Sequence, residues 1–124
     1  MSTVLIIEDN EKNMKLARDV LQAKGYKTLE AVTGEDGVKL AKERKPDLVL
    51  MDIQLPGING IEAFKQIRAD AATKAIPVIA LTASVTPTDR TAITAAGFDA
   101  FVGKPINLRE FLETVKRLLE KSRT

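Results

Sequence analysis

The sequence predicts an α/β fold of the (βα)5 type, in which helices cover both faces of a parallel sheet. Five short apolar runs alternate with five longer amphipathic stretches along the chain. The clearest runs are apolar at every position, which is typical of parallel strands buried on both faces. Right-handed crossovers place all the carboxyl ends at one edge of such a sheet, and ligands bind there, where the strand order reverses.

The expected strands are short. The clear ones are residues 4–7, 48–51 and 78–81, with the sequences VLII, LVLM and VIAL. Residues 27–31 and 100–102 are weaker runs, and their position between helical stretches identifies them as strands. The five runs therefore account for a complete parallel sheet.

The helices between the strands have start and stop signals. Pro87 stands where a first helical residue needs no N–H group, and Gly25 and Gly97 follow the periodic segments as stops. The last helix has one apolar face between Leu108 and Leu119. Four helix starts have the spacing of a capping box; they are Thr33 with Asp36, Asn59 with Glu62, Thr86 with Asp89, and Asn107 with Glu110.

Composition limits the chemistry. The 124 residues fit one domain, so we expect residues 1–124 to form a single unit without an attached output domain. A net charge of +2 indicates neither a nucleic-acid nor a membrane partner. The chain has no cysteine and no histidine, so carboxylates, hydroxyls and lysine must do any chemistry. No apolar run has the length of a membrane span and no signal peptide is visible, so we expect a cytoplasmic protein.

Polar residues follow the apolar runs where the strands are expected to end. Glu8 and Asp9 follow the first strand, Asp52 the third, Thr82 the fourth, and Lys104 the fifth. Because these strand ends share one edge of a parallel sheet, the side chains should meet there.

These residues stand in motifs that resemble the response-regulator receiver domain family over nearly the whole chain. The motifs are IIEDN at 6–10, LMDIQLP at 50–56 with Gly60, ALTA at 80–83, and KPI at 104–106. The first two look most like the stand-alone DivK-type receivers. The resemblance implies a doubly wound, flavodoxin-like sheet with strand order 2-1-3-4-5.

The resemblance implies that Asp52 is the phosphoacceptor and that Mg²⁺, or Mn²⁺ as an alternative, is the cofactor. The metal ligands would be Asp9, Asp52 and the backbone carbonyl of Gln54, with Glu8 acting mainly through a bound water. Lys104 would pair with the phosphoryl oxygens and Thr82 would donate its hydroxyl to one of them.

Other residues gain a role only through the resemblance. Phe101 matches an aromatic switch position that acts with Thr82, but it could equally be a static core residue. Gln54 and Ser84 match positions that tune the lifetime of the phosphate, and loop filler is an equal alternative for both. Pro105 matches a cis-proline position or a simple helix start. Gly60 matches the glycine that ends the site loop or a plain turn glycine before a helix.

The expected function is a two-component phosphorelay receiver, not a turnover enzyme, with only self-catalysed phosphoryl acceptance and slow autodephosphorylation. Its partners would be a sensor histidine kinase or histidine phosphotransfer protein and a downstream protein. The downstream protein would dock on the face of the fourth helix, fifth strand and fifth helix. Alternatives are an aspartyl-phosphate phosphohydrolase, which needs an acid where Gln54 stands, a flavodoxin-like cofactor binder, and a degenerate receiver acting as a scaffold.

Overall fold

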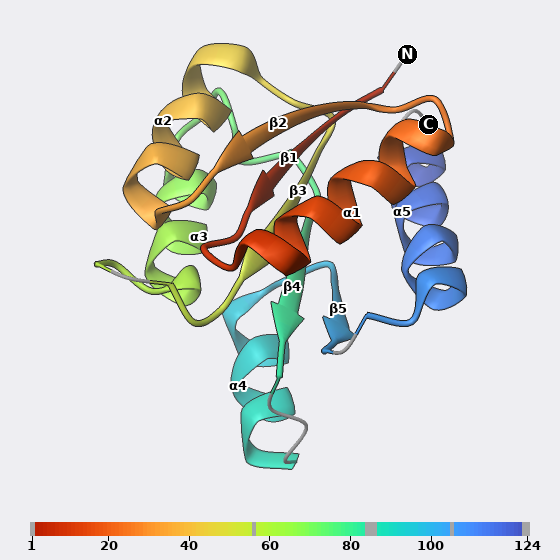
Figure 1. Cartoon of the computed structure of the whole chain (residues 1–124). Coiled ribbons are helices and arrows are strands. Elements are labelled where there is room, and N and C mark those ends of the chain that lie inside the picture. The colour runs from red at the N-terminus through yellow and green to blue at the C-terminus, as the bar shows by residue number, and fades with distance from the viewer. Residues whose placement is uncertain (1, 56, 84–86, 105, 123–124) are drawn as a thin grey trace.

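The structure, a computed structural model, describes residues 2–55, 57–83, 87–104 and 106–122. Strands and helices alternate along this part of the chain (Figure 1). The elements are β1 Thr3–Ile7, α1 Glu11–Ala23, β2 Lys27–Ala31, α2 Gly34–Arg44, β3 Leu48–Asp52, α3 Gly60–Ala69, β4 Val78–Thr82, α4 Pro87–Ala96, β5 Ala100–Gly103 and α5 Leu108–Ser122.

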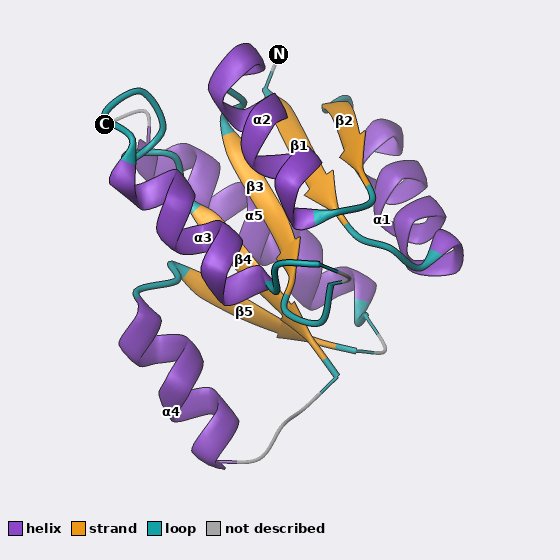
Figure 2. Cartoon of the chain, turned by 90° about the vertical axis from the view of Figure 1, so that its left-hand side faces the viewer, coloured by secondary structure: helices purple, strands orange, loops and turns teal. Residues whose placement is uncertain are grey.

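All neighbouring strands pair in parallel, in the order β2-β1-β3-β4-β5. Both the predicted (βα)5 fold and the predicted strand order are confirmed. Helices α1 and α5 lie on one face of the sheet, and α2, α3 and α4 lie on the other (Figure 2). Every strand ends toward the same edge, so β1 and β3, which start the two halves of the sheet, end side by side.

The unbroken apolar runs follow from burial on both faces. All five residues of β3 are buried. Leu48 and Leu50 pack toward α1 and α5, whereas Val49 and Met51 pack toward α2 and α3. Because side chains alternate across a strand, each face needs its own apolar set, and an alternating polar pattern is excluded.

Helix caps fix where the helices begin. The side chains of Thr33, Asn59 and Asn107 accept hydrogen bonds from the backbone N–H groups three residues on, as predicted. Asn10 caps α1 in the same way, which the sequence analysis missed. Thr86 lies outside the described residues, but α4 does begin at Pro87.

Glycines end two helices in the left-handed region, where a side chain would be strained. Gly25 has φ +89° and Gly97 has φ +100°, which confirms both predicted stops. Helix α2 instead ends at Arg44 and is capped by Lys45 with φ 45°, a non-glycine residue that no sequence signal marks.

An ion-paired cluster lies at the amino-terminal ends of β4 and β5, at the edge of the sheet opposite the strand carboxyl ends. Asp99 Oδ2 accepts hydrogen bonds from Arg68 at 2.6 Å and from the Val78 N–H at 2.8 Å. The Arg68 guanidinium also lies over the Phe64 ring, 4.7 Å from its centroid, and Phe64 stacks on Phe98. This cluster joins α3 to the starts of β4 and β5.

Among the described helices, none is both long and apolar enough to cross a bilayer.

Candidate functional site

The ends of β1 and β3 bring acidic side chains together. The Glu8 N–H donates to the Ala31 carbonyl at 3.0 Å, which extends the ladder between β1 and β2 by one residue. Asp52 is the last residue of β3 and its neighbour on β4 is Leu81. Glu8 is 1% exposed and Asp52 is 2% exposed, while Asp9 faces solvent. Two carboxylates are therefore held in a largely buried setting.

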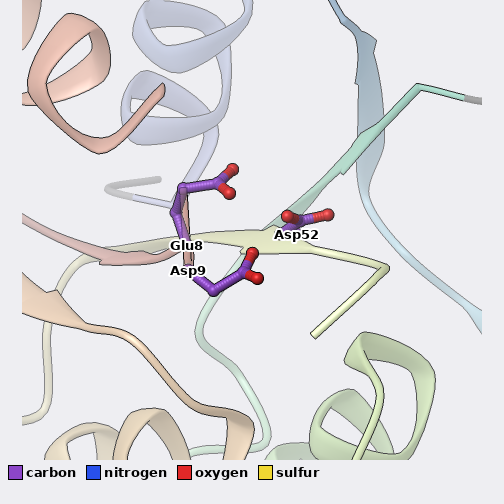
Figure 3. Close-up of side chains that lie close together, drawn as sticks. All are labelled: Glu8, Asp9 and Asp52. Atoms are coloured by element: carbon purple, nitrogen blue, oxygen red, sulfur yellow. The ribbon is translucent and has the colours of Figure 1, made fainter. Parts of the chain in front are cut away.

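The three carboxylates converge at this edge (Figure 3). Glu8, Asp9 and Asp52 each offer one oxygen, and these oxygens all lie within 4.8 Å of one another. Like charges at this separation repel strongly where water is excluded. Such a cluster is stable only with protons, a metal ion or a basic side chain to offset the charge.

Lys104 supplies the basic side chain. Its Nζ lies 2.8 Å from Asp52 Oδ2 and 3.1 Å from Glu8 Oε2, so one ammonium group bridges two of the three carboxylates. Its backbone N–H donates to the Thr82 carbonyl at 2.8 Å, which continues the ladder between β4 and β5. The sheet therefore sets the position of Lys104, and the cluster still has more negative than positive groups.

The surroundings shift two pKa values. Burial, together with the neighbouring Asp52 carboxylate, raises the pKa of Glu8 from 4.5 to about 7, against a lowering effect of the Asn10 N–H and of Lys104. Burial alone would lower the pKa of the Lys104 ammonium, but its contacts with Asp52 and Glu8 outweigh burial and raise it. Glu8 therefore changes charge near neutral pH while Lys104 stays protonated.

Backbone contacts fix the Asp52 side chain and the loop after it. Asp52 Oδ1 accepts a hydrogen bond from the Gln54 N–H at 3.0 Å. The Ile53 N–H donates to Leu81, and the Ile53 carbonyl accepts from the Gly60 N–H at 2.9 Å. A Cβ atom on residue 60 would lie 2.3 Å from the Asp52 carbonyl oxygen, so only glycine fits here.

The donor set suits a hard divalent cation. Three carboxylates offer oxygen ligands only, which is the preference of Mg²⁺ and Mn²⁺. Among the described residues, the buried Oε2 of Glu8 accepts no hydrogen bond and has only the ion pair with Lys104. A buried carboxylate oxygen in this state is one that a cation or a cation-bound water would satisfy.

The structure brings together four of the residues that the sequence analysis selected: Glu8, Asp9, Asp52 and Lys104. Thr82 is buried at the end of the adjacent strand β4, beside the backbone of Lys104.

Phe101, on β5, is 36% exposed and lies on a groove of about 420 Å³ between the α4–β5 segment and α5. The side chain of Gln54 faces solvent. Ser84 and Pro105 lie outside the described residues. Sequence reasoning missed Asn10, whose N–H donates to Glu8 Oε1 at 3.0 Å; its place directly after the acidic pair was the available signal.

Known proteins match this chain over most of its length. The model of the response regulator receiver domain family matches residues 4–116. The polar-differentiation response regulators DivK of Brucella anthropi and Brucella abortus are each 45% identical over 117 residues, which cover 94% of this chain and 95% of the relative.

Solved structures agree in fold. The receiver domain of the sensor histidine kinase PA1611 from Pseudomonas aeruginosa, with a magnesium ion coordinated in its active-site cleft, matches with a TM-score of 0.90 at 30% identity. That match covers 96% of this chain and 98% of the other. The chemotaxis protein CheY4 of Vibrio cholerae matches with a TM-score of 0.89 at 26% identity, over 95% of this chain and 98% of the other.

Proposed function

This chain belongs to the response regulator receiver domain family, and from that premise we propose that Asp52 accepts a phosphoryl group from a phosphohistidine on a partner protein. The observation that carries the proposal is the position of the Asp52 carboxylate. It is buried at the end of β3, bonded to the Gln54 N–H on one oxygen and to Lys104 Nζ on the other. A carboxylate held in this way can act as a nucleophile of fixed orientation.

The transfer exchanges one bond for another. A carboxylate oxygen of Asp52 attacks the phosphorus atom, the P–O bond forms, and the P–N bond to the donor imidazole breaks. The Lys104 ammonium, already 2.8 Å from Asp52, is close enough to pair with the oxygens of the added group. Thr82, at the neighbouring strand end, carries the hydroxyl that we assign to one of those oxygens.

Glu8, Asp9 and Asp52, with the backbone carbonyl of Gln54, would hold Mg²⁺ or Mn²⁺. The ion supplies charge neutralisation between two anions, the carboxylate and the incoming phosphoryl group. Two observations support this assignment: the buried Oε2 of Glu8 accepts no hydrogen bond, and carboxylates outnumber ammonium groups among the described residues of the site.

The site supports a slow switch more than a turnover enzyme. Hydrolysis of an aspartyl phosphate needs a group that removes a proton from the attacking water. Gln54, two residues after Asp52, is an amide and transfers no protons, and the chain has no histidine. We therefore assign only self-catalysed acceptance and slow loss of the phosphoryl group to this chain.

We propose that the downstream protein binds to the face formed by α4, β5 and α5. The groove of about 420 Å³ on this face is lined by residues from all three elements, including Ile93, Phe101 and Arg117. The exposed ring of Phe101 could turn inward and change the shape of this groove. Phosphorylation would favour whichever of two arrangements binds the downstream protein more tightly.

The direct test uses a small phosphodonor such as acetyl phosphate with Mg²⁺, followed by intact-protein mass measurement. We expect the mass gain of one phosphoryl group in the wild type and none in Asp52→Asn. Chelation of the metal should abolish the gain, whereas Asp47→Asn, a change at an exposed aspartate before β3, should leave it intact. An adduct of equal yield on Asp52→Asn would overturn the assignment.

A further inference from the structure

A chemically labile pair of residues lies in the loop between β3 and α3. Asn59 is followed by Gly60, and the other three asparagines of the chain precede Glu, Met and Leu. An asparagine before glycine is prone to spontaneous loss of its side-chain amide, because no side chain on the next residue shields the backbone nitrogen.

We propose that Asn59 is a spontaneous deamidation site whose rate the fold controls through the two hydrogen bonds that hold this loop. In the first step the Gly60 nitrogen attacks Asn59 Cγ, and the Cγ–Nδ2 bond breaks. Ammonia leaves with the proton from the Gly60 nitrogen, and a cyclic imide remains. Water then opens the imide at either carbonyl, which gives aspartate or isoaspartate.

The native contacts oppose the first step on both reacting groups. The Gly60 N–H donates to the Ile53 carbonyl at 2.9 Å, so the proton that the nitrogen must lose before it attacks is held in a hydrogen bond. Asn59 Oδ1 accepts the Glu62 N–H at 2.9 Å as the cap of α3, so the side chain points along the helix. Ring closure requires both bonds to open. The folded chain therefore reacts only from a locally open state.

The fold also retains the labile sequence. A Cβ atom on residue 60 would meet the Asp52 carbonyl oxygen at 2.3 Å and Ile53 Cα at 2.7 Å, so no shielding side chain can be placed there. Asparagine at residue 59 is among the best helix caps. The same close approach that makes Gly60 necessary thus leaves Asn59 beside an unshielded nitrogen.

The two products differ in their effect on the loop. Aspartate at residue 59 keeps a side-chain oxygen in the capping position and adds only a charge near the positive end of α3, which tolerates it. Isoaspartate inserts one methylene group into the main chain between residue 59 and Gly60. It therefore displaces the Gly60 N–H from Ile53, next to Asp52. We infer that isoaspartate is the damaging product and aspartate a nearly silent one.

The test compares deamidation at residue 59 in the folded chain and in the chain unfolded in urea, at mildly alkaline pH, by peptide mapping with mass spectrometry. Two hydrogen bonds must open in the folded chain. We therefore expect the folded chain to deamidate at least about tenfold more slowly than the unfolded chain. Equal deamidation rates in the folded and the unfolded chain would overturn the proposal that the fold controls the reaction. Faster loss at Asn10, Asn13 or Asn107 than at Asn59 in urea would overturn the choice of site.

Two variants complete the test. Asn59→Ser keeps a capping oxygen without an amide, and aged samples should gain no isoaspartate at this position, as measured by enzymatic isoaspartate methylation of the isolated peptide. Isolation of the peptide is needed because Asp36, before Gly37, forms the same kind of imide. Asn59→Asp should melt close to the wild type, and the aged isoaspartyl fraction should melt clearly lower. Equal melting of these two samples would refute the difference between the products.

Discussion

Glu8 makes the stability of the metal-free chain depend on pH near neutrality. Its pKa rises from 4.5 in the unfolded chain to about 7 in the fold, first because it is buried and then because Asp52 is adjacent. The folded chain thus holds the Glu8 proton more tightly than the unfolded chain. The stabilisation is fully present below pH 4.5 and is lost as the pH rises through 7.

The size of the effect follows from the shift. At about 1.4 kcal/mol per pKa unit, the rise from 4.5 to about 7 sets an upper value of about 3 kcal/mol. For a chain of 124 residues this corresponds to a fall of roughly 10 °C in melting temperature between pH 5 and pH 8. A glutamine at residue 8 resembles the protonated acid, so Glu8→Gln should match the wild type at pH 5 and exceed it at pH 8.

The assay is thermal unfolding with a chelator present, followed by circular dichroism in half-unit pH steps. Glu43→Gln is a matched control, because Glu43 is exposed on α2. It should reproduce the wild-type profile, with only a small offset. Two results would refute the assignment of this proton to Glu8. One is a wild-type melting temperature that stays level or rises from pH 5 to pH 8. The other is a Glu8→Gln profile that runs parallel to the wild-type profile.

Two further predictions concern the same edge of the sheet. Asp52→Asn removes one of three clustered charges while Lys104 keeps its partner Glu8, so at pH 8 without metal it should raise the melting temperature by several degrees. Titration with Mg²⁺ should then stabilise the wild type more than the variant, and equal gains would count against the metal site. Gly60→Ala should lower the free energy of unfolding by about 3 kcal/mol or more, because the new Cβ meets backbone atoms. At Gly25 the space is open and only φ is unfavourable, so Gly25→Ala should lower the free energy of unfolding by only about 1 kcal/mol. Urea titration of both variants measures the two losses.

Much of the fold could be predicted because the sheet is buried on both sides. The apolar runs mark β1, β3 and β4 to within one residue at their ends, and the missing residue in β3 and β4 is the polar one, Asp52 or Thr82. A hydropathy pattern ends at the first polar residue, although the ladder continues through it. The left-handed Lys45 was not predictable, because nothing in its side chain favours that conformation.

The membership of the site could be predicted, but its electrostatics could not. Strand ends and motifs identified Glu8, Asp9, Asp52 and Lys104 as neighbours. They did not indicate that one ammonium group bridges two carboxylates, or that Glu8 is 1% exposed. Burial depends on contacts between residues that are distant in the sequence, and such contacts leave no local pattern. Asp99 and Arg68 were missed for the same reason, because they pair across 31 positions of the chain.

The two outer strands of the sheet differ in how well they oppose pairing with a second molecule. Strand β2 has exposed charges at Lys27 and Glu30, and such charges on an edge strand discourage the addition of another strand. Strand β5, at the opposite edge, consists of Ala100, Phe101, Val102 and Gly103 and has no charge. At high protein concentration, loss of solubility should therefore begin at β5, and Phe101→Lys, which places a charge at the exposed residue of this strand, should delay it.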